Sequence, residues 1–117
     1  MTRRLLMILC VPVTTTGEVD PRWGRAARVA VAEVVGGEMR RWDEHDVAWD
    51  RLHDEDSEGG HHARVARFVQ DHRVTVVVAH HMGDPMLHML DRMDVGVRLG
   101  VSGDARRAVL AAAAHIA

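Results

Sequence analysis

The chain has 117 residues, which fits one domain of residues 1–117 with a core of ordinary size. Its formal net charge is −2 and acids lie among the arginines, so we expect no nucleic-acid partner, which would need a basic face. All fifteen basic residues are arginine, which excludes lysine Schiff-base chemistry and a lysine phosphate loop. One cysteine excludes an internal disulfide, and a reducing cytoplasm is the expected location.

The chain starts in a way that is similar to a signal peptide, with Arg3 and Arg4 before the apolar residues 5–13. A lipoprotein cleavage site needs a small residue before its cysteine, whereas Leu9 precedes Cys10. We therefore interpret residues 5–13 as a buried first strand, in which Cys10 is a small apolar core residue. No apolar run approaches the ~20 residues of a membrane helix, so no membrane partner is expected.

Two more strands are expected next. Residues 14–17 form a turn, and the apolar residues 28–35 form the second strand. Gly36-Gly37 is a two-residue hairpin signal that leads into a third strand from residue 38 to about 47. Residues 43–60 are acidic and end in glycine, which indicates an exposed loop. We expect the two tryptophans of this part to be partly exposed, with an interaction surface as the alternative reading: Trp42 and Trp49.

Helical periodicity begins after this loop. Residues 61–73 are predicted to be helical because apolar positions recur at helical spacing: Val65, Phe68, Val69 and His72. The β-branched residues 74–79 predict a central strand, and residues 80–83 its exit turn. Asp84 is the expected N-cap of the next helix, with Pro85 at its first position.

The remaining elements continue the alternation of helix and strand. The second helix buries Met86, Leu87, Leu90 and Met93. Residues 95–99 form the last strand, and Ser102 or Gly103 begins a helix with the inner side Val109, Leu110, Ala113 and Ile116. This order predicts an α/β fold with a mixed five-stranded sheet flanked by helices, in which the first and fourth strands are adjacent and parallel.

The segment after the first strand, residues 17–26, carries the most informative motif. It turns through Gly17 and continues Arg22-Trp23-Gly24-Arg25-Ala26. This stretch resembles the dinitrogenase iron-molybdenum cofactor biosynthesis family, whose members continue His-Phe-Gly-Arg-Ala at this point. The turn, the aromatic residue and the Gly-Arg-Ala step are kept, whereas Arg22 stands where the family has histidine.

The resemblance extends over nearly the whole chain and implies a ribonuclease H-like three-layer fold. It also implies a non-enzymatic domain that binds or carries an iron-sulfur or iron-molybdenum type metallocluster in nitrogenase cofactor assembly. A nuclease activity is not expected, because two-metal phosphoryl chemistry needs carboxylates on the central strands. Residues 5–13 and 74–79 contain no acid.

The candidate site lies where the first and fourth strands end, because ligands of open α/β sheets bind at the carboxyl ends of parallel strands. There the amide groups of the Gly83-Asp84 turn favour an anion. Arg22 cannot ligate a metal, but its guanidinium can pair with an anion through two hydrogen bonds. The predicted residues for an anionic cluster or ligand are Arg22, Gly24, Arg25, Gly83 and Asp84.

Four histidines are candidate metal ligands. His80 and His81 follow the fourth strand; neighbours in an extended chain point to opposite faces, so both converge only if the strand has already turned. The alternative is that both are rim residues bonded to the backbone. His61 and His62 match a histidine-rich segment of the family and would capture metal, with His53 as a further donor; polar helix-start residues are the alternative.

These features together predict a carrier of an anionic metallocluster. The alternative function is a protein-interaction or regulatory domain with a partner protein, which keeps the fold and has lost the cluster site, as Arg22 would allow.

Overall fold

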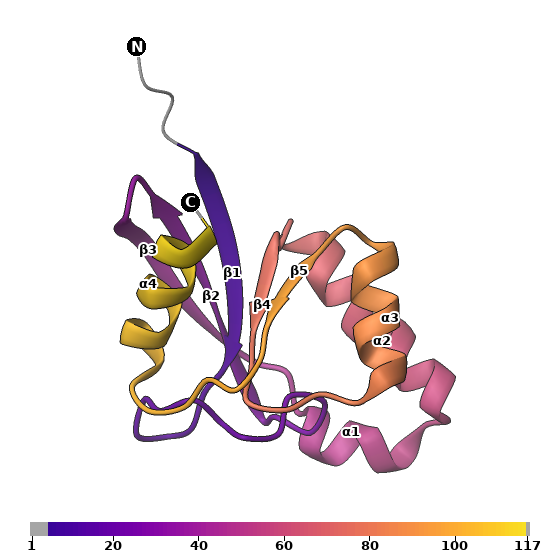
Figure 1. The fold of residues 1–117 in the computed structure, drawn as a ribbon. Helices are drawn as coiled ribbons and strands as arrows, with labels where there is room; N and C mark the ends of the chain where they lie inside the picture. Colours follow the sequence, from indigo (N-terminus) through magenta and orange to yellow (C-terminus); the bar gives the residue numbers. More distant parts are fainter. Residues whose placement is uncertain (1–4, 117) are drawn as a thin grey trace.

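The structure is a computed structural model that describes residues 5–116, so Arg3 and Arg4 lie outside the described residues (Figure 1). In this part of the chain the elements are β1 (Leu6–Pro12), β2 (Arg28–Val35), β3 (Glu38–Asp46), α1 (Trp49–Glu55), α2 (Glu58–Asp71), β4 (Val76–Val78), α3 (Asp84–Arg92), β5 (Gly96–Arg98) and α4 (Ala105–Ile116).

The five strands form one mixed sheet in the order β3-β2-β1-β4-β5. β1 lies in the centre, antiparallel to β2 and parallel to β4, with Leu9 opposite Val76 and Cys10 opposite Val77. Strands with neighbours on both edges and helices on both faces need continuous apolar runs, which is what the sequence of β1 provides. The predicted α/β class, mixed sheet and parallel pairing of the first and fourth strands are confirmed.

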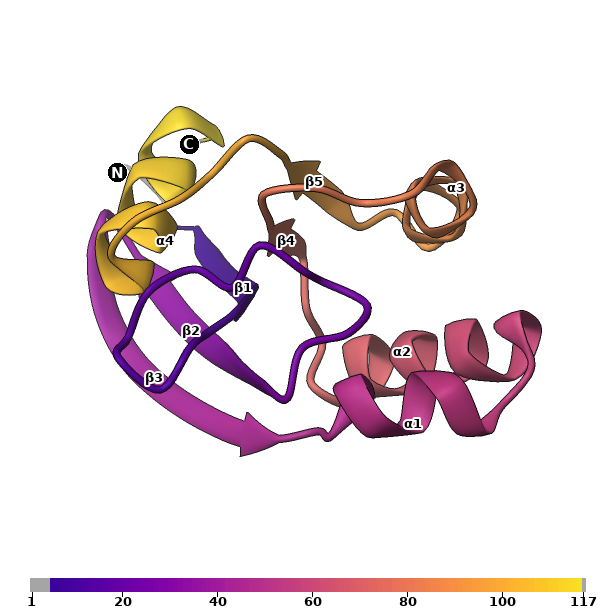
Figure 2. The ribbon, with the colours of Figure 1, turned by 90° about the horizontal axis from the view of Figure 1, so that it is seen from below.

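The sheet separates two apolar cores. Cys10 of β1 packs into the core beneath α1, α2 and α3, whereas its neighbours Leu9 and Val11 pack beneath α4. Figure 2 shows α4 on one side of the sheet and α1 and α2 on the other. Alternating side chains of one strand therefore serve both cores, and the result is the expected ribonuclease H-like three-layer arrangement.

The predicted hairpin joins β2 and β3. Gly36 and Gly37 have φ angles of 58° and 82°, and Val35 pairs with Glu38. Two consecutive residues with positive φ match a two-residue turn whose twist follows that of the strands, which explains the glycine pair.

The predicted exposed loop over residues 43–60 is wrong. β3 continues to Asp46, α1 follows from Trp49, and α2 begins at Glu58 with Ser57 as its N-cap, where Ser57 Oγ accepts a hydrogen bond from Gly60 N at 3.0 Å. Trp49 was expected to be partly exposed, but only 1% of it is accessible. Burial of this one large side chain anchors a short helix whose other residues are mostly polar.

The other differences concern where two helices start and how one side chain is exposed. Gly83, and not Asp84, is the N-cap of α3, and α4 begins at Ala105, after the predicted Ser102 or Gly103. The Asp104 carboxylate accepts a hydrogen bond from Arg107 N at 3.0 Å, which satisfies an amide of the first turn. Ile116, predicted to face the core, is 46% exposed.

None of the described helices is long and apolar enough to cross a membrane.

Candidate functional site

The chain leaves β1 and β4 side by side, as the sequence predicts. Asp20 is buried, its amide donates to Pro12 O at 2.9 Å, and its carboxylate accepts from Arg22 N at 3.0 Å. These bonds turn the segment back toward β4, where Arg22 forms an isolated parallel bridge with His81. The buried Asp20 therefore holds the segment after β1 beside the segment after β4.

A cleft of about 310 Å³ opens beside this bridge. Its walls come from the loop after β1, from His53 of α1, from the beginning of α2 and from the turn into α3. The residues that line it are Pro21, Arg22, Trp23, Gly24, Arg25, His53, Glu58, His61, His62, His81, Met82, Gly83, Pro85 and Met86.

Most predicted site residues meet in this cleft: Arg22, Gly24, Arg25, His61, His62, His81 and Gly83. His80 and Asp84 are exposed and do not line it. The carbonyl of His80 accepts a hydrogen bond from Gly100 N at 2.9 Å, on the β5 side. β4 has ended at Val78 and the chain bends at His80, and of the two neighbouring histidines only His81 lines the cleft.

His61 is held by two hydrogen bonds and is only 2% exposed. Its Nε2 lies 2.7 Å from Gly24 O, which can only accept, and Arg64 Nη1 donates to its Nδ1 at 3.0 Å. The ring is therefore neutral with its proton on Nε2. Burial lowers the pKa of His61, and the hydrogen bond to Gly24 opposes this shift. Neither ring nitrogen has a lone pair left for a ligand.

Arg64 supports the same wall from α2. It pairs with Asp56 and donates to Leu52 O at 3.4 Å, so it ties α1 to α2 behind the cleft. Neither Arg64 nor the lining residue Glu58 stood out in the sequence. Arg64 lies three residues after His61 in a predicted helix, and this spacing alone would have placed the two side chains next to each other.

Trp23 lines the cleft and packs against Trp49. The Trp23 and Trp49 rings meet edge to face, with 5.2 Å between their centroids. Trp23 is 2% exposed, and its Nε1 has no hydrogen-bond partner among the described residues. Buried polar groups are normally paired, so this N–H group is available to donate a hydrogen bond to a ligand in the cleft.

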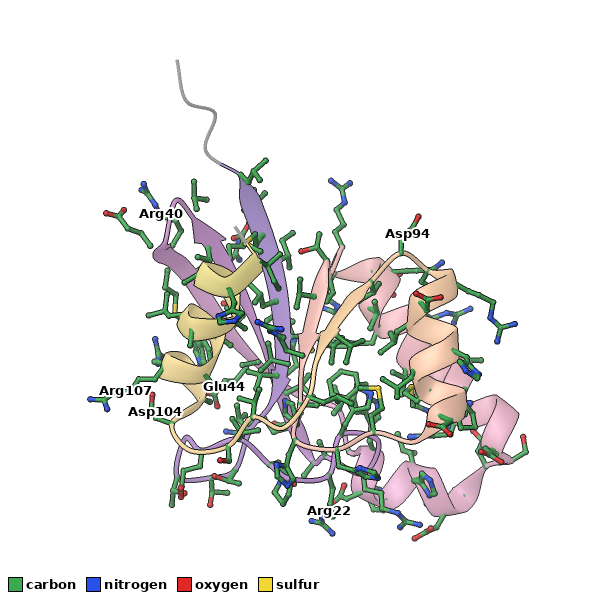
Figure 3. All side chains as sticks on the ribbon, in the orientation of Figure 1. Arg22, Arg40, Glu44, Asp94, Asp104 and Arg107 are labelled. Atoms are coloured by element: carbon green, nitrogen blue, oxygen red, sulfur yellow. The ribbon has the colours of Figure 1, made fainter. Side chains whose placement is uncertain are left out.

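The lining of the cleft contains more cationic than anionic side chains, Arg22 and Arg25 against Glu58. Arg22 is exposed and lies 3.8 Å from Asp20, and Figure 3 shows its side chain at the lower edge of the molecule, reaching into solvent. Arg25 pairs with Asp54 at 3.3 Å. The imidazoles of His53, His62 and His81 are further nitrogen donors, and α3 begins at the cleft without a side chain capping its amides. Glu58 is the carboxylate among the described lining residues.

The donors present favour an anion over a bare metal ion. Within residues 5–116, no three histidine, cysteine, aspartate or glutamate side chains converge as a metal site requires. Cys10 is buried in β1, and burial raises the pKa of its thiol far above the usual range, so it supplies no thiolate. Guanidinium groups, N–H groups and single imidazoles suit a multi-atom anion such as a sulfide-ringed cluster.

Comparisons with known proteins identify the family of this chain and support its fold. The sequence model of the family described as dinitrogenase iron-molybdenum cofactor matches residues 7–115. The fold is similar to the crystal structure of PH0822, with 17% identity, a TM-score of 0.72, and 91% of this chain and 88% of that chain covered. It is also similar to the apo form of the orange protein from Desulfovibrio gigas, with 20% identity, a TM-score of 0.72, and 93% and 88% covered. Comparison with curated proteins gives no match. Because the family match spans almost the full length, this chain belongs to the dinitrogenase iron-molybdenum cofactor family.

Proposed function

We propose that this domain is a non-enzymatic carrier that holds an anionic metallocluster of iron-sulfur or iron-molybdenum type, or a related anionic ligand, in the cleft between β1, β4 and α2. Family membership and the positive cleft support this proposal. The observation that carries it is that Arg22, Arg25 and His81, from two separate loops, line one hollow. The cluster is the cargo, and the protein supplies a shaped, positive surface for it.

Each part of the cleft has a role in this proposal. His81 and His62 present imidazoles with no hydrogen bond to the rest of the described chain, so they are free to ligate a metal at the cluster surface. Arg22 and Arg25 pair with negative charge, while the amides of the Gly83-Asp84 turn and Trp23 Nε1 donate to sulfide or oxygen atoms. His61 holds the Gly24 carbonyl in place and supports the wall.

Arg22 sets the character of the binding. A guanidinium pairs with an anion by charge and hydrogen bonds and forms no bond to a metal, unlike the histidine that the family has there. The cargo therefore has one metal ligand fewer at this position and is released more readily, as a carrier requires.

The proposal includes no reaction. β1 and β4 contain no carboxylate that would clamp two metal ions at the sheet centre, which supports the absence of nuclease chemistry. A partner protein would receive the cargo, in the cytoplasm, with no nucleic acid or membrane involved.

Two residues favour a second candidate function. Arg22 has replaced the ligating histidine, and Asp84 places a negative charge in the first turn of α3, which opposes an anion. Both would suit an interaction or regulatory domain that has lost its cluster.

The test measures binding of tetrathiomolybdate, a sulfide-ringed molybdenum anion, and of iron with sulfide, under anaerobic conditions. Equilibrium dialysis with elemental analysis gives stoichiometry and affinity. His81→Ala and Arg22→Ala should each weaken binding about tenfold, as loss of a charge-assisted or ligand contact does. His80→Ala is the matched control, because this neighbour lies outside the cleft, and it should bind as the parent does.

Three further variants separate the roles. Arg22→His should bind more tightly by adding a ligand. His62→Ala should weaken binding modestly, because His62 lines the cleft but is more exposed than its neighbour His61. Arg67→Ala, exposed on α2 and outside the cleft, should change nothing. Absence of binding by the parent, or equal affinities for His81→Ala and His80→Ala, would favour the interaction-domain function instead.

A further inference from the structure

The α4 side of the sheet is only partly covered. α4 packs on β1, β2 and β4. Figure 2 shows that no helix of the described chain lies on the same side of β5. α3 packs against β5 from the opposite side, so β5 is an edge strand with one open face. This surface shares no lining residue with the cleft described above.

Two hollows follow the seam between α4 and β5 and meet at Arg98. The first, of about 520 Å³, has a wall made by α4 at Ala108, Ala111 and Ala112. The second, of about 410 Å³, continues past Gly96. We name the two hollows together the α4–β5 groove. Alanine and glycine leave room along it for another backbone to come close.

The far end of the α4–β5 groove is apolar. It is lined by Leu5, Leu6 and Ile116, which are 66%, 53% and 46% exposed. They are three of the four large apolar side chains that the described residues leave exposed; the fourth, Leu99, is 43% exposed and lines neither hollow. Three exposed apolar side chains gathered at one site are typical of a binding surface.

Arg98 gives the groove a positive centre. Its side chain is half-buried and lines both hollows, yet it makes no hydrogen bond or ion pair within residues 5–116. Arg107 and His115 line the same groove, and Figure 3 shows Arg107 reaching into solvent from the first turn of α4. Asp104 is engaged by Arg107 N at the helix start. A guanidinium has five N–H donors, and in apolar surroundings a carboxylate is the group that pairs with it best.

We propose that the α4–β5 groove binds an amphipathic helix of a partner protein, with an apolar stripe along α4 and a carboxylate that meets Arg98. The twelve residues of α4 span about 18 Å, which matches a helix of three turns lying alongside it. The small residues of α4 allow the close approach that helix pairs with alanine contacts adopt. A second copy of this chain fits less well, because a symmetric contact would bring two Arg98 side chains into one interface.

The probe is a synthetic peptide of about fifteen residues, with leucine at helical spacing on one face and glutamate along both flanks. Its fluorescence anisotropy gives the affinity for the full chain, and amide chemical shifts locate the contact on α4 and β5. A peptide with lysine in place of glutamate is the control for charge. The acidic peptide should bind about tenfold more tightly than the basic one, and salt should weaken it.

Two matched pairs of variants test the place of binding. Arg98→Glu should weaken the acidic peptide at least about tenfold, whereas Arg67→Glu on α2 should not. Ala111→Glu in the groove should block the peptide, whereas Ala114→Glu, exposed on α4 outside both hollows, should not. Circular dichroism and urea unfolding show that each variant is folded.

Three results would overturn the proposal. One is failure of the acidic peptide to bind, or equal binding of both peptides. Another is equal affinity of Arg98→Glu and Arg67→Glu. The third is a dimer of the parent in sedimentation that Ala111→Glu dissociates, which would assign the groove to a second copy. None of these outcomes depends on metallocluster binding in the cleft, so the two proposals fail separately.

Discussion

Single residues explain how the cleft is held. His61 connects Gly24 O to Arg64, and through Arg64 to Asp56 and Leu52, so one buried imidazole joins the loop after β1 to both helices behind it. A histidine that serves as a structural bridge must stay neutral. The loss of that bridge on protonation gives the protein a measurable dependence on pH.

Folded-state stability should fall as the pH drops below about 6.5, the pKa of an unfolded histidine. Burial lowers the pKa of His61 in the folded protein. Between the folded and unfolded pKa values, the imidazole is therefore protonated in the unfolded chain and neutral in the folded chain. The loss grows from about pH 6.5 down to the lowered folded pKa and then levels off. Urea unfolding between pH 7.5 and 4.5 measures it.

His61→Gln is the matched variant for this effect, because glutamine keeps one donor and one acceptor and does not titrate. Its stability should decline less over the same pH interval than that of the parent. If the two curves run parallel, His61 does not cause the dependence. His61→Ala, which leaves Gly24 O unpaired and opens a cavity, should cost about 3 kcal/mol at pH 7.5.

Cys10 offers a second test at the same scale. Complete burial in β1 keeps the thiol protonated, and thiol reagents need the thiolate and access to it. An aromatic disulfide reagent should therefore react with one thiol per chain in urea and not measurably in the native protein. Rapid reaction without denaturant would show that β1 opens easily or lies at an edge.

At the scale of elements, glycine has opposite effects at two positions. Gly37 in the hairpin has a φ of 82°, whereas Gly59 lies in the first turn of α2 with nothing within 4 Å of where a Cβ would be. Gly37→Ala should destabilise the protein by about 1 kcal/mol, because a residue with a Cβ is strained there. Gly59→Ala should stabilise it by about 0.5–1 kcal/mol through the lower entropy of the unfolded chain.

Urea unfolding of both glycine variants gives the signs directly. Gly37→Asn, which tolerates positive φ better than alanine, should recover part of the loss. A stabilising Gly37→Ala would mean that the turn between β2 and β3 differs from the one described.

For the whole molecule, the central strands should be the last to exchange their amide hydrogens. Leu9, Cys10 and Val11 of β1 are fully buried, and β1 is paired on both edges, whereas α1 is short and mostly exposed. Exchange monitored by NMR should be slowest in β1 and β4 and fastest in α1. If residues 1–117 form one domain, calorimetric and van't Hoff enthalpies of unfolding should agree. Two separate transitions would contradict a single domain.

The five strands, the parallel pairing of the first with the fourth and the meeting of two loops at their ends could be predicted from the sequence. An uninterrupted apolar run in β1 and the β-branched β4 require cover on both faces, and paired glycines define the hairpin, because these properties belong to neighbouring residues along the chain. The meeting of Arg22 with His81 followed from the rule that parallel strands end at one edge.

The tertiary structure alone decided which predicted residues share the cleft. Whether His80 or His81 faces the cleft depends on the bend after β4, where Gly100 N donates a hydrogen bond to His80 O and His81 forms a bridge with Arg22. α1 escaped notice because its stability comes from the burial of Trp49 against Trp23, a contact between residues 26 positions apart. Likewise His61 is a bridge and Arg98 lacks a partner, and both facts depend on distant groups that local sequence does not specify.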